Sequence, residues 1–177
     1  MGSDSPQLLD LYGRLAWSVL YRGGFEESEV LFRTTIKRHS KVQGERHRDA
    51  LSSAEGLAIT LEQLGNIDEA ACWYEKVYFG NLERFPPESV QTLSACYGLG
   101  QFYQSQSRYD DALNLYHDHI RQIRKMQEAK GLRYGVQLAI TTVEQWMRAK
   151  PDSFGTRDWF LRHFRKNAEI LEEDTNV

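Results

Sequence analysis

Cysteine is scarce in this chain: only Cys72 and Cys96 occur among the 177 residues. Two lone cysteines do not suggest a secreted fold held together by disulfides. Both fall inside apparent helices, at positions where a small core residue is expected. We therefore interpret each of them as a free, buried thiol.

The sequence also lacks any run of about 18 apolar residues, which a transmembrane helix would need. The first six residues, up to Pro6, contain neither the basic segment nor the apolar core of a signal peptide. They also miss the myristoylation pattern, because Pro6 stands where serine or threonine is required. We therefore expect a cytoplasmic protein, or a fragment of one, with no membrane as a partner.

No charge of one sign dominates, since 22 basic and 25 acidic residues give a formal net charge of −3. This balance gives no global reason to expect a nucleic acid partner. Residues 121–150 do carry seven basic side chains against two acidic ones. Such a segment could dock an acidic partner or a phosphate backbone, but a solvated outer helix face is the simpler interpretation.

What the sequence does contain is an internal repeat of 42 residues. Three sets of similar residues recur at this spacing: Phe25, Ile67 and Tyr109; Leu15, Leu57 and Leu99; Ser28, Ala70 and Ala112. A fixed period of this size is the signature of stacked helical hairpins. Such stacks usually present a binding surface and seldom carry chemistry, so the repeat favours an interaction scaffold.

Each repeat reads as two helices joined by a short turn, with apolar residues at helical spacing in both. We expect three hairpins at about 8–48, 49–87 and 88–130, the second ending at Pro86-Pro87. The register fails after about Glu128, and we expect residues 131–173 to form a degenerate fourth hairpin that caps the stack. No segment reads as a strand. The predicted fold is therefore an all-α solenoid of tandem hairpins, a single domain over residues 1–177.

The recurring residues resemble the tetratricopeptide repeat family, in its long, kinesin-light-chain type. In the first helix, a large residue precedes a Leu-small pair and another large residue follows it, as in Tyr12, Leu15-Ala16 and Val19. We expect Leu15 on the inward apolar face of its helix. In the second helix, a small residue precedes an aromatic residue by four positions: Ser28/Phe32, Ala70/Tyr74 and Ala112/Tyr116. The resemblance covers about residues 8–128.

The resemblance implies a right-handed superhelix whose first helices line a concave groove for peptide segments. The long-repeat type usually has an asparagine pair directly before the Leu-small pair, and those asparagines hold the ligand backbone. This chain has Gly13-Arg14, Glu55-Gly56 and Tyr97-Gly98 there. Either the groove reads side chains instead, or it is not the working surface.

Groove positions carried over from the family fall on eight residues: Trp17, Tyr21, Glu55, Ile59, Glu62, Tyr97, Gln101 and Gln104. Aromatic residues in a polar rim are typical of binding hot spots. The expected partner is a protein or peptide segment with apolar anchors and a basic residue, which Glu55 and Glu62 would select. The alternative is that Trp17 and Tyr21 pack against a neighbouring element.

The histidines do not indicate a metal site. His117 and His119 are two residues apart on one helix and point about 200° apart, so they cannot share an ion. His119 also stands where the other repeats have Thr35 and Val77, and we expect it in the core. The other three, His39, His47 and His163, have no Cys, Asp or Glu companions at ligand spacing.

No pattern of catalytic residues, and no cofactor motif, can be assembled from the sequence. The segment Gly98-Leu99-Gly100 is a fragment of a dinucleotide loop that lies in mid-helix without a preceding strand. We therefore predict a non-enzymatic scaffold or adaptor that binds other proteins. The alternative is self-assembly, for example as a homodimer, or a sensor domain of a larger protein with a nucleotide switch.

Overall fold

The computed structural model describes residues 6–44, 47–130, 141–143 and 145. This part of the chain is built from helices and turns and contains no strand, which confirms the all-α prediction. By its internal contacts the chain divides into two compact units, Met1–Arg84 and Phe85–Val177. The single-domain prediction stays a prediction. Most of the expected capping hairpin and His163 lie outside the described residues.

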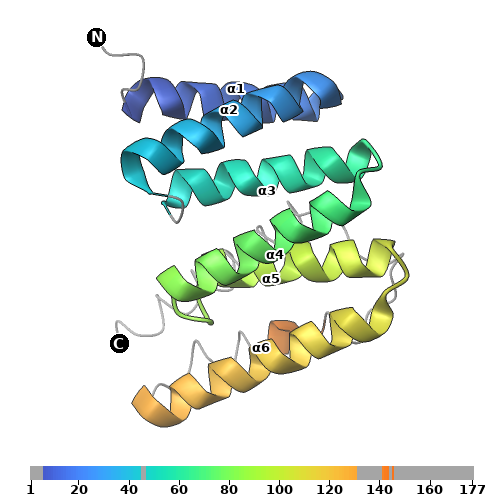
Figure 1. Ribbon diagram of the computed structural model, residues 1–177. Coiled ribbons are helices and arrows are strands. Elements are labelled where there is room, and N and C mark those ends of the chain that lie inside the picture. The colour runs from blue at the N-terminus through green and yellow to red at the C-terminus, as the bar shows by residue number, and fades with distance from the viewer. Residues whose placement is uncertain (1–5, 45–46, 131–140, 144, 146–177) are drawn as a thin grey trace, which may run out of the picture. The chain divides into compact units, whose positions relative to one another are not determined.

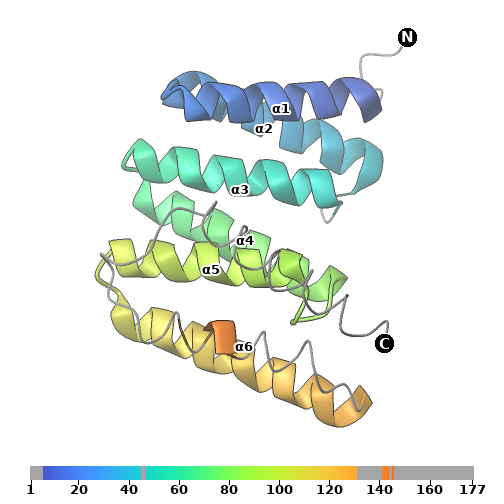
Figure 2. The same cartoon turned by 180° about the vertical axis from the view of Figure 1, so that it is seen from behind.

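The first unit contains two helical hairpins (Figure 1), formed by α1 (Pro6–Tyr21), α2 (Phe25–Gln43), α3 (Arg48–Gln63) and α4 (Ile67–Arg84). Helix α2 packs against both α1 and α3, α3 packs against α4, and α1 also contacts α3. Seen from behind, α1 and α3 lie on the near side and α2 and α4 on the far side (Figure 2). The first helices of the two hairpins therefore share one side of this unit.

The second unit contains a third hairpin, formed by α5 (Val90–Ser105) packed against α6 (Tyr109–Lys130). Residues Phe25, Ile67 and Tyr109, which mark the 42-residue period, are the first residues of α2, α4 and α6. The sequence repeat is therefore a repeat of helical hairpins.

The same turn ends the first helix of each of the three described hairpins. Gly23, Gly65 and Ser107 lie 42 residues apart and have φ values of 81°, 78° and 59°. The amide that follows each of them reaches back five residues to a carbonyl oxygen, at 3.1, 2.9 and 2.8 Å. This is the hydrogen bond of a Schellman motif, and it requires the left-handed conformation at the preceding residue. Glycine adopts that conformation without strain, whereas Ser107 adopts it despite its side chain.

Large aromatic side chains pack against small residues where the helices meet. Phe32 of α2 is fully buried, and a Cβ at Gly56 of α3 would collide with its ring. In the third hairpin, Tyr116 of α6 lies in the same way against Gly100 of α5. The small residues Ser28, Ala70 and Ala112 are all buried. Close approach of helices at small residues is thus used in both units.

Two expectations about buried residues are wrong. Leu57 and Leu99 are 0% and 2% exposed, but Leu15, at the same repeat position, is 49% exposed. It lies on α1, which has α2 and α3 as its neighbours within the unit. Cys96 is buried as expected, whereas Cys72 is exposed. The helical period of α4 buries Ala70, Tyr74 and Val77, and Cys72 falls outside that stripe.

An ion-pair network joins the second helices of the first two hairpins. Arg33 of α2 contacts Glu69 of α4 at 2.7 Å and Glu29 of its own helix at 2.8 Å. Trp73 donates a hydrogen bond from Nε1 to Glu69 at 3.2 Å. The hydrogen bond from Arg33 holds the pKa of the Glu69 carboxyl below its usual value. All of these groups are solvent-accessible, so the network contributes on the order of 1 kcal/mol or less.

His119 lies in the core of the third hairpin, as its repeat position predicts. It is fully buried, and Thr35 and Val77 at the corresponding positions are 1% and 3% exposed. Burial lowers the pKa of His119 to about 4, although a hydrogen bond with the backbone of Pro87 acts in the opposite direction. The folded chain therefore holds this imidazole neutral.

No helix in the described ranges combines the length and the apolar character that crossing a membrane would require.

Substitutions at two helix glycines are expected to change stability in opposite directions. Gly56→Ala should destabilise the first unit by about 1–2 kcal/mol, because the new methyl group overpacks the Phe32 ring. Gly13→Ala should stabilise it by about 0.5–1 kcal/mol, because a Cβ there makes only ordinary contacts, at 3.9 and 4.0 Å. Urea unfolding followed by circular dichroism measures both. Equal shifts for the two variants would contradict the packing described here.

The pKa of His119 predicts a loss of stability in acid. An unfolded histidine titrates near 6.5, so below that pH the unfolded state takes up a proton that the folded state excludes. The contribution of neutral His119 to the free energy of unfolding should be complete above about pH 6.5. It should fall by about 3 kcal/mol as the pH drops to about 4. The variant His119→Val, which copies Val77, should lack this part of the pH dependence. The comparison is of unfolding free energies at several pH values, and parallel pH profiles would refute the assignment.

Candidate functional site

Five of the eight predicted binding residues lie on the first helices of the first unit. Trp17 and Tyr21 are one turn apart near the end of α1, and Glu55, Ile59 and Glu62 fall on one face of α3 because of their spacing. Since α1 contacts α3, these helices are neighbours. We call this set of five residues the α1/α3 face.

The aromatic pair of the α1/α3 face packs against the buried Phe32 ring. The rings of Trp17 and Tyr21 stack with their centroids 5.6 Å apart and their planes at 28°. The Trp17 ring also meets the buried Phe32 ring edge-on, at 5.4 Å and 79°. Tyr21 itself remains 75% exposed. Contacts of these two kinds are the favourable geometries for aromatic rings, so the core fixes Trp17 and Trp17 in turn supports an exposed Tyr21.

The acidic part of the α1/α3 face is also supported from the core side. The hydroxyl of Tyr74, a buried residue of α4, donates a hydrogen bond of 2.9 Å to the Glu62 carboxylate. Glu55, Ile59 and Glu62 are each partly exposed. Two carboxylates two helical turns apart, with an apolar side chain between them, suit a ligand that carries both a cation and an apolar group.

The other three predicted residues, Tyr97, Gln101 and Gln104, lie on α5 in the second unit. Tyr97 is only 5% exposed, and burial raises the pKa of its hydroxyl. It therefore offers little surface to a partner, whereas Gln101 and Gln104 are partly exposed. The amide of Gln101 donates a hydrogen bond of 3.0 Å to the side-chain oxygen of Gln104.

Burial also raises the pKa values of Cys96 and Tyr116 in the third hairpin. It raises the pKa of Cys96 well above its usual value, so the reactive thiolate is suppressed. Burial likewise raises the pKa of Tyr116, and the neighbouring Cys96 and Tyr97 add to the shift. Both side chains behave as parts of the core.

One constellation was missed by sequence reasoning. His39 and His47 were expected to have no ligand companions, but they lie together with Asp49, and the ligand atoms of the three residues are all within 4.8 Å of one another. In the sequence, only the closeness of His47 and Asp49 at the start of α3 could have indicated a metal site. His39 lies on α2, before the connection to α3, and helical periodicity does not predict which residues of two successive helices lie close together.

Comparison with known proteins gives the same picture of the fold. Tetratricopeptide repeat models match residues 7–78 and 95–130. No curated protein matches the chain. A kinesin-light-chain-like protein of Podosopora anserina with nearly identical TPR-like repeats aligns with a TM-score of 0.58 and 22% identity, over 75% of this chain and 59% of that one.

Two further solved structures show the same likeness. Another structure of the Podosopora anserina repeats has a TM-score of 0.58 and 22% identity, over 80% of this chain and 67% of that one. BtubC (BKLC) from P. vanneervenii has a TM-score of 0.58 and 15% identity, over 84% of this chain and 66% of that one. The chain thus spans 59–67% of the length of these three proteins. At these identities the likeness concerns the fold alone.

The matched repeats cover more than half of the chain, and their helices carry the 42-residue period of the long type. The chain therefore belongs to the tetratricopeptide repeat family.

Proposed function

We propose that this chain is a non-enzymatic adaptor that binds a segment of a partner protein through its α1/α3 face. Tetratricopeptide repeats generally mediate protein–protein interaction. The observation that carries the proposal is the Trp17–Tyr21 stack, in which a 75% exposed aromatic ring is held by a core-anchored one. An exposed aromatic residue that is already ordered loses little conformational entropy when a partner covers it.

Each residue of the face has a role in this proposal. Tyr21 and Ile59 supply apolar contacts, with Trp17 as the wall behind Tyr21. Glu55 and Glu62 select a lysine or arginine of the partner, and the hydrogen bond from Tyr74 keeps Glu62 in place. Asparagine clamps are absent, so recognition here depends on side chains.

The three predicted residues of α5 form a separate proposed contact region within the second unit. Gln101 and Gln104 offer amide groups that can bond to a peptide backbone, and Tyr97 contributes mainly to the packing beneath them. The proposed ligand of the α1/α3 face is a segment with apolar anchors and one basic residue. We place this interaction in the cytoplasm.

Charge reversal on α3 tests the proposal. The variant Glu55→Lys/Glu62→Lys should lose binding of basic, apolar peptides by about a hundredfold or more, because two attractive charges become repulsive. The measurement is selection from a library of short random peptides on wild type, followed by affinity measurement on both proteins. The expected selected peptides combine aromatic or aliphatic residues with lysine or arginine.

The matched control is Glu26→Lys/Glu83→Lys, which changes the net charge equally at two exposed positions outside the α1/α3 face. Circular dichroism checks that both variants remain helical. Peptides that bind the α3 variant as tightly as wild type, or that lose affinity equally for the control, would remove this face from consideration.

Self-assembly is a second candidate function, favoured by the exposed leucines of α1. Leu11 and Leu15 are 53% and 49% exposed, although the equivalents of Leu15 in the later repeats are buried. Beside them, Asp10 and Arg14 form an ion pair of 3.3 Å on the helix surface. In an antiparallel pair of α1 helices from two copies, Asp10 of each copy can face Arg14 of the other, so this surface is self-complementary.

If α1 forms a homodimer contact, Leu11→Glu/Leu15→Glu should convert a dimer into a monomer, because four carboxylates would be buried in it. Sedimentation velocity over a range of concentrations measures the change. Val30→Glu, at a 65% exposed position on α2, is the control and should leave the association state unchanged. A wild-type chain that is monomeric at every concentration would exclude this function.

A further inference from the structure

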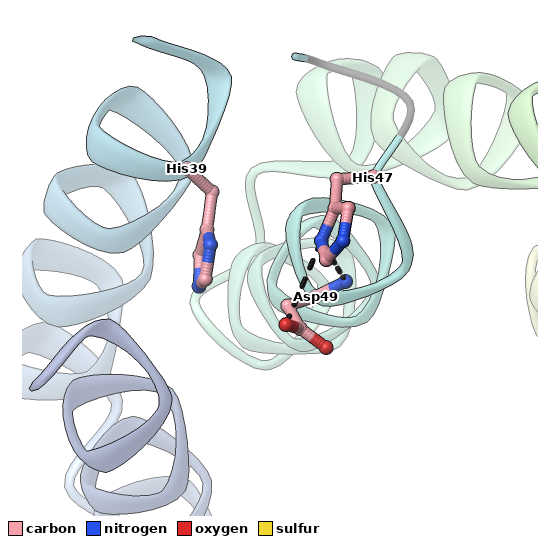
Figure 3. Close-up of side chains that lie close together, drawn as sticks. All are labelled: His39, His47 and Asp49. Carbon is pink, nitrogen blue, oxygen red and sulfur yellow. Dashed lines mark hydrogen bonds and ion pairs between the residues drawn. The ribbon is translucent and has the colours of Figure 1, made fainter. Parts of the chain in front are cut away.

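The connection between the first two hairpins brings together three side chains that ligate metals. His39 lies near the end of α2, His47 is the residue directly before α3, and Asp49 lies in the first turn of α3 (Figure 3). The ligand atoms of the three residues all lie within 4.8 Å of one another. Both helices belong to the first unit, and they pack directly against each other.

The geometry of this cluster is close to that of a zinc site. In tetrahedral coordination with bonds of about 2.1 Å, neighbouring ligand atoms are about 3.4 Å apart. The distance from His47 Nδ1 to Asp49 Oδ2 is already 3.5 Å. The two imidazole rings are 6.4 Å apart between centroids and nearly parallel, at 16°, so the His47 ring must turn for both nitrogens to point at one ion. Closing the widest separation requires movement of a little over 1 Å, which rotation of the His47 and Asp49 side chains can supply.

The burial of the three residues fits a metal site with one open position. His39 is 1% exposed, so the core around it restricts the movement of its side chain. The side chains of His47 and Asp49 are 29% and 45% exposed, so they can adjust and water can reach the ion. Two imidazoles and one carboxylate, with water in the fourth position, form a ligand set that Zn²⁺ accepts.

The simpler interpretation is that His47 only caps α3. Its Nδ1 accepts a hydrogen bond of 3.4 Å from the amide of Asp49, two residues further on. At the next inter-repeat joint, the residue 42 positions later is Ser89, whose hydroxyl caps α5 by accepting a bond of 3.3 Å from the amide of Thr92, three residues further on. Serine is the better cap, so capping does not account for histidine at position 47.

The next joint of the same chain is built without any of the three side chains. The residues 42 positions after His39, His47 and Asp49 are Asn81, Ser89 and Gln91. Asn81 is buried like His39 and donates a hydrogen bond to the carbonyl of Val77. The first joint thus departs from the second at all three positions, and each departure introduces a metal ligand.

We propose that His39, His47 and Asp49 bind a divalent transition-metal ion, with Zn²⁺ as the preferred ion, and that this ion links α2 to α3. Because the ligands come from two successive hairpins, the bound ion would fix the joint between them. Imidazole ligands disfavour Mg²⁺ and Ca²⁺, which prefer oxygen donors.

The test is calorimetric titration of the full chain, free of any polyhistidine tag and treated with a chelator, with Zn²⁺ alone. One ion per chain is expected. His47→Asn and Asp49→Asn should each weaken binding by at least about tenfold, and His47→Asn keeps a residue able to cap α3. Two controls should bind as wild type does: Asp68→Asn, in the first turn of α4, and His117→Asn, at an exposed histidine.

A second measurement does not depend on the variants. In imidazole ¹⁵N–¹H spectra of the wild-type chain, Zn²⁺ should shift the resonances of His39 and His47 and leave those of His117 and His119 in place. Absence of these shifts, or Zn²⁺ binding to the His47→Asn/Asp49→Asn variant as tight as that of wild type, would overturn the proposal.

Discussion

The close packing of one aromatic ring, Phe32, is the constraint on which the first unit depends. From α2 it reaches α3 at Gly56, where no side chain larger than hydrogen fits, and it meets Trp17 of α1 edge-on. One buried residue therefore sets the distance to the following hairpin and the orientation of the tryptophan in its own hairpin. Because Trp17 carries the exposed Tyr21, the proposed binding face is positioned by the same contact that holds the two hairpins together.

A comparison of equivalent positions in the repeats helps to distinguish residues needed for packing from residues available for binding. At Ser28, Ala70 and Ala112 the repeats agree on a small residue, all three are buried, and their role is packing. Where they differ, the residue is free to take on another role. His39 and His47 replace Asn81 and Ser89 at the inter-repeat joint. The proposed metal-ligating joint and the Trp17–Tyr21 stack both fall at such departures from the repeat, since Ile59 and Gln63 stand 42 residues after Trp17 and Tyr21.

The sequence predicted most of the fold, because each helix boundary depends on local chemistry that recurs every 42 residues. The starts of α2, α4 and α6 and the burial of His119 follow from that period alone. Periodicity cannot show which neighbour covers a helix, so the exposure of Leu15 and the burial of Tyr97 needed the structure. The cluster around His39 was hidden for another reason: its members are close only because the chain folds back between α2 and α3.

The Arg33–Glu69 ion pair has a mechanical consequence. It joins α2 to α4 on the side of the unit formed by the second helices, and both side chains are about 40% exposed. Dissolved ions weaken such a pair, since exposed charges are screened over a Debye length of about 8 Å at physiological ionic strength. The ion pair therefore contributes less to holding the two hairpins together in concentrated salt than in dilute buffer, whereas the buried contact of Phe32 with Gly56 does not depend on ionic strength in this way.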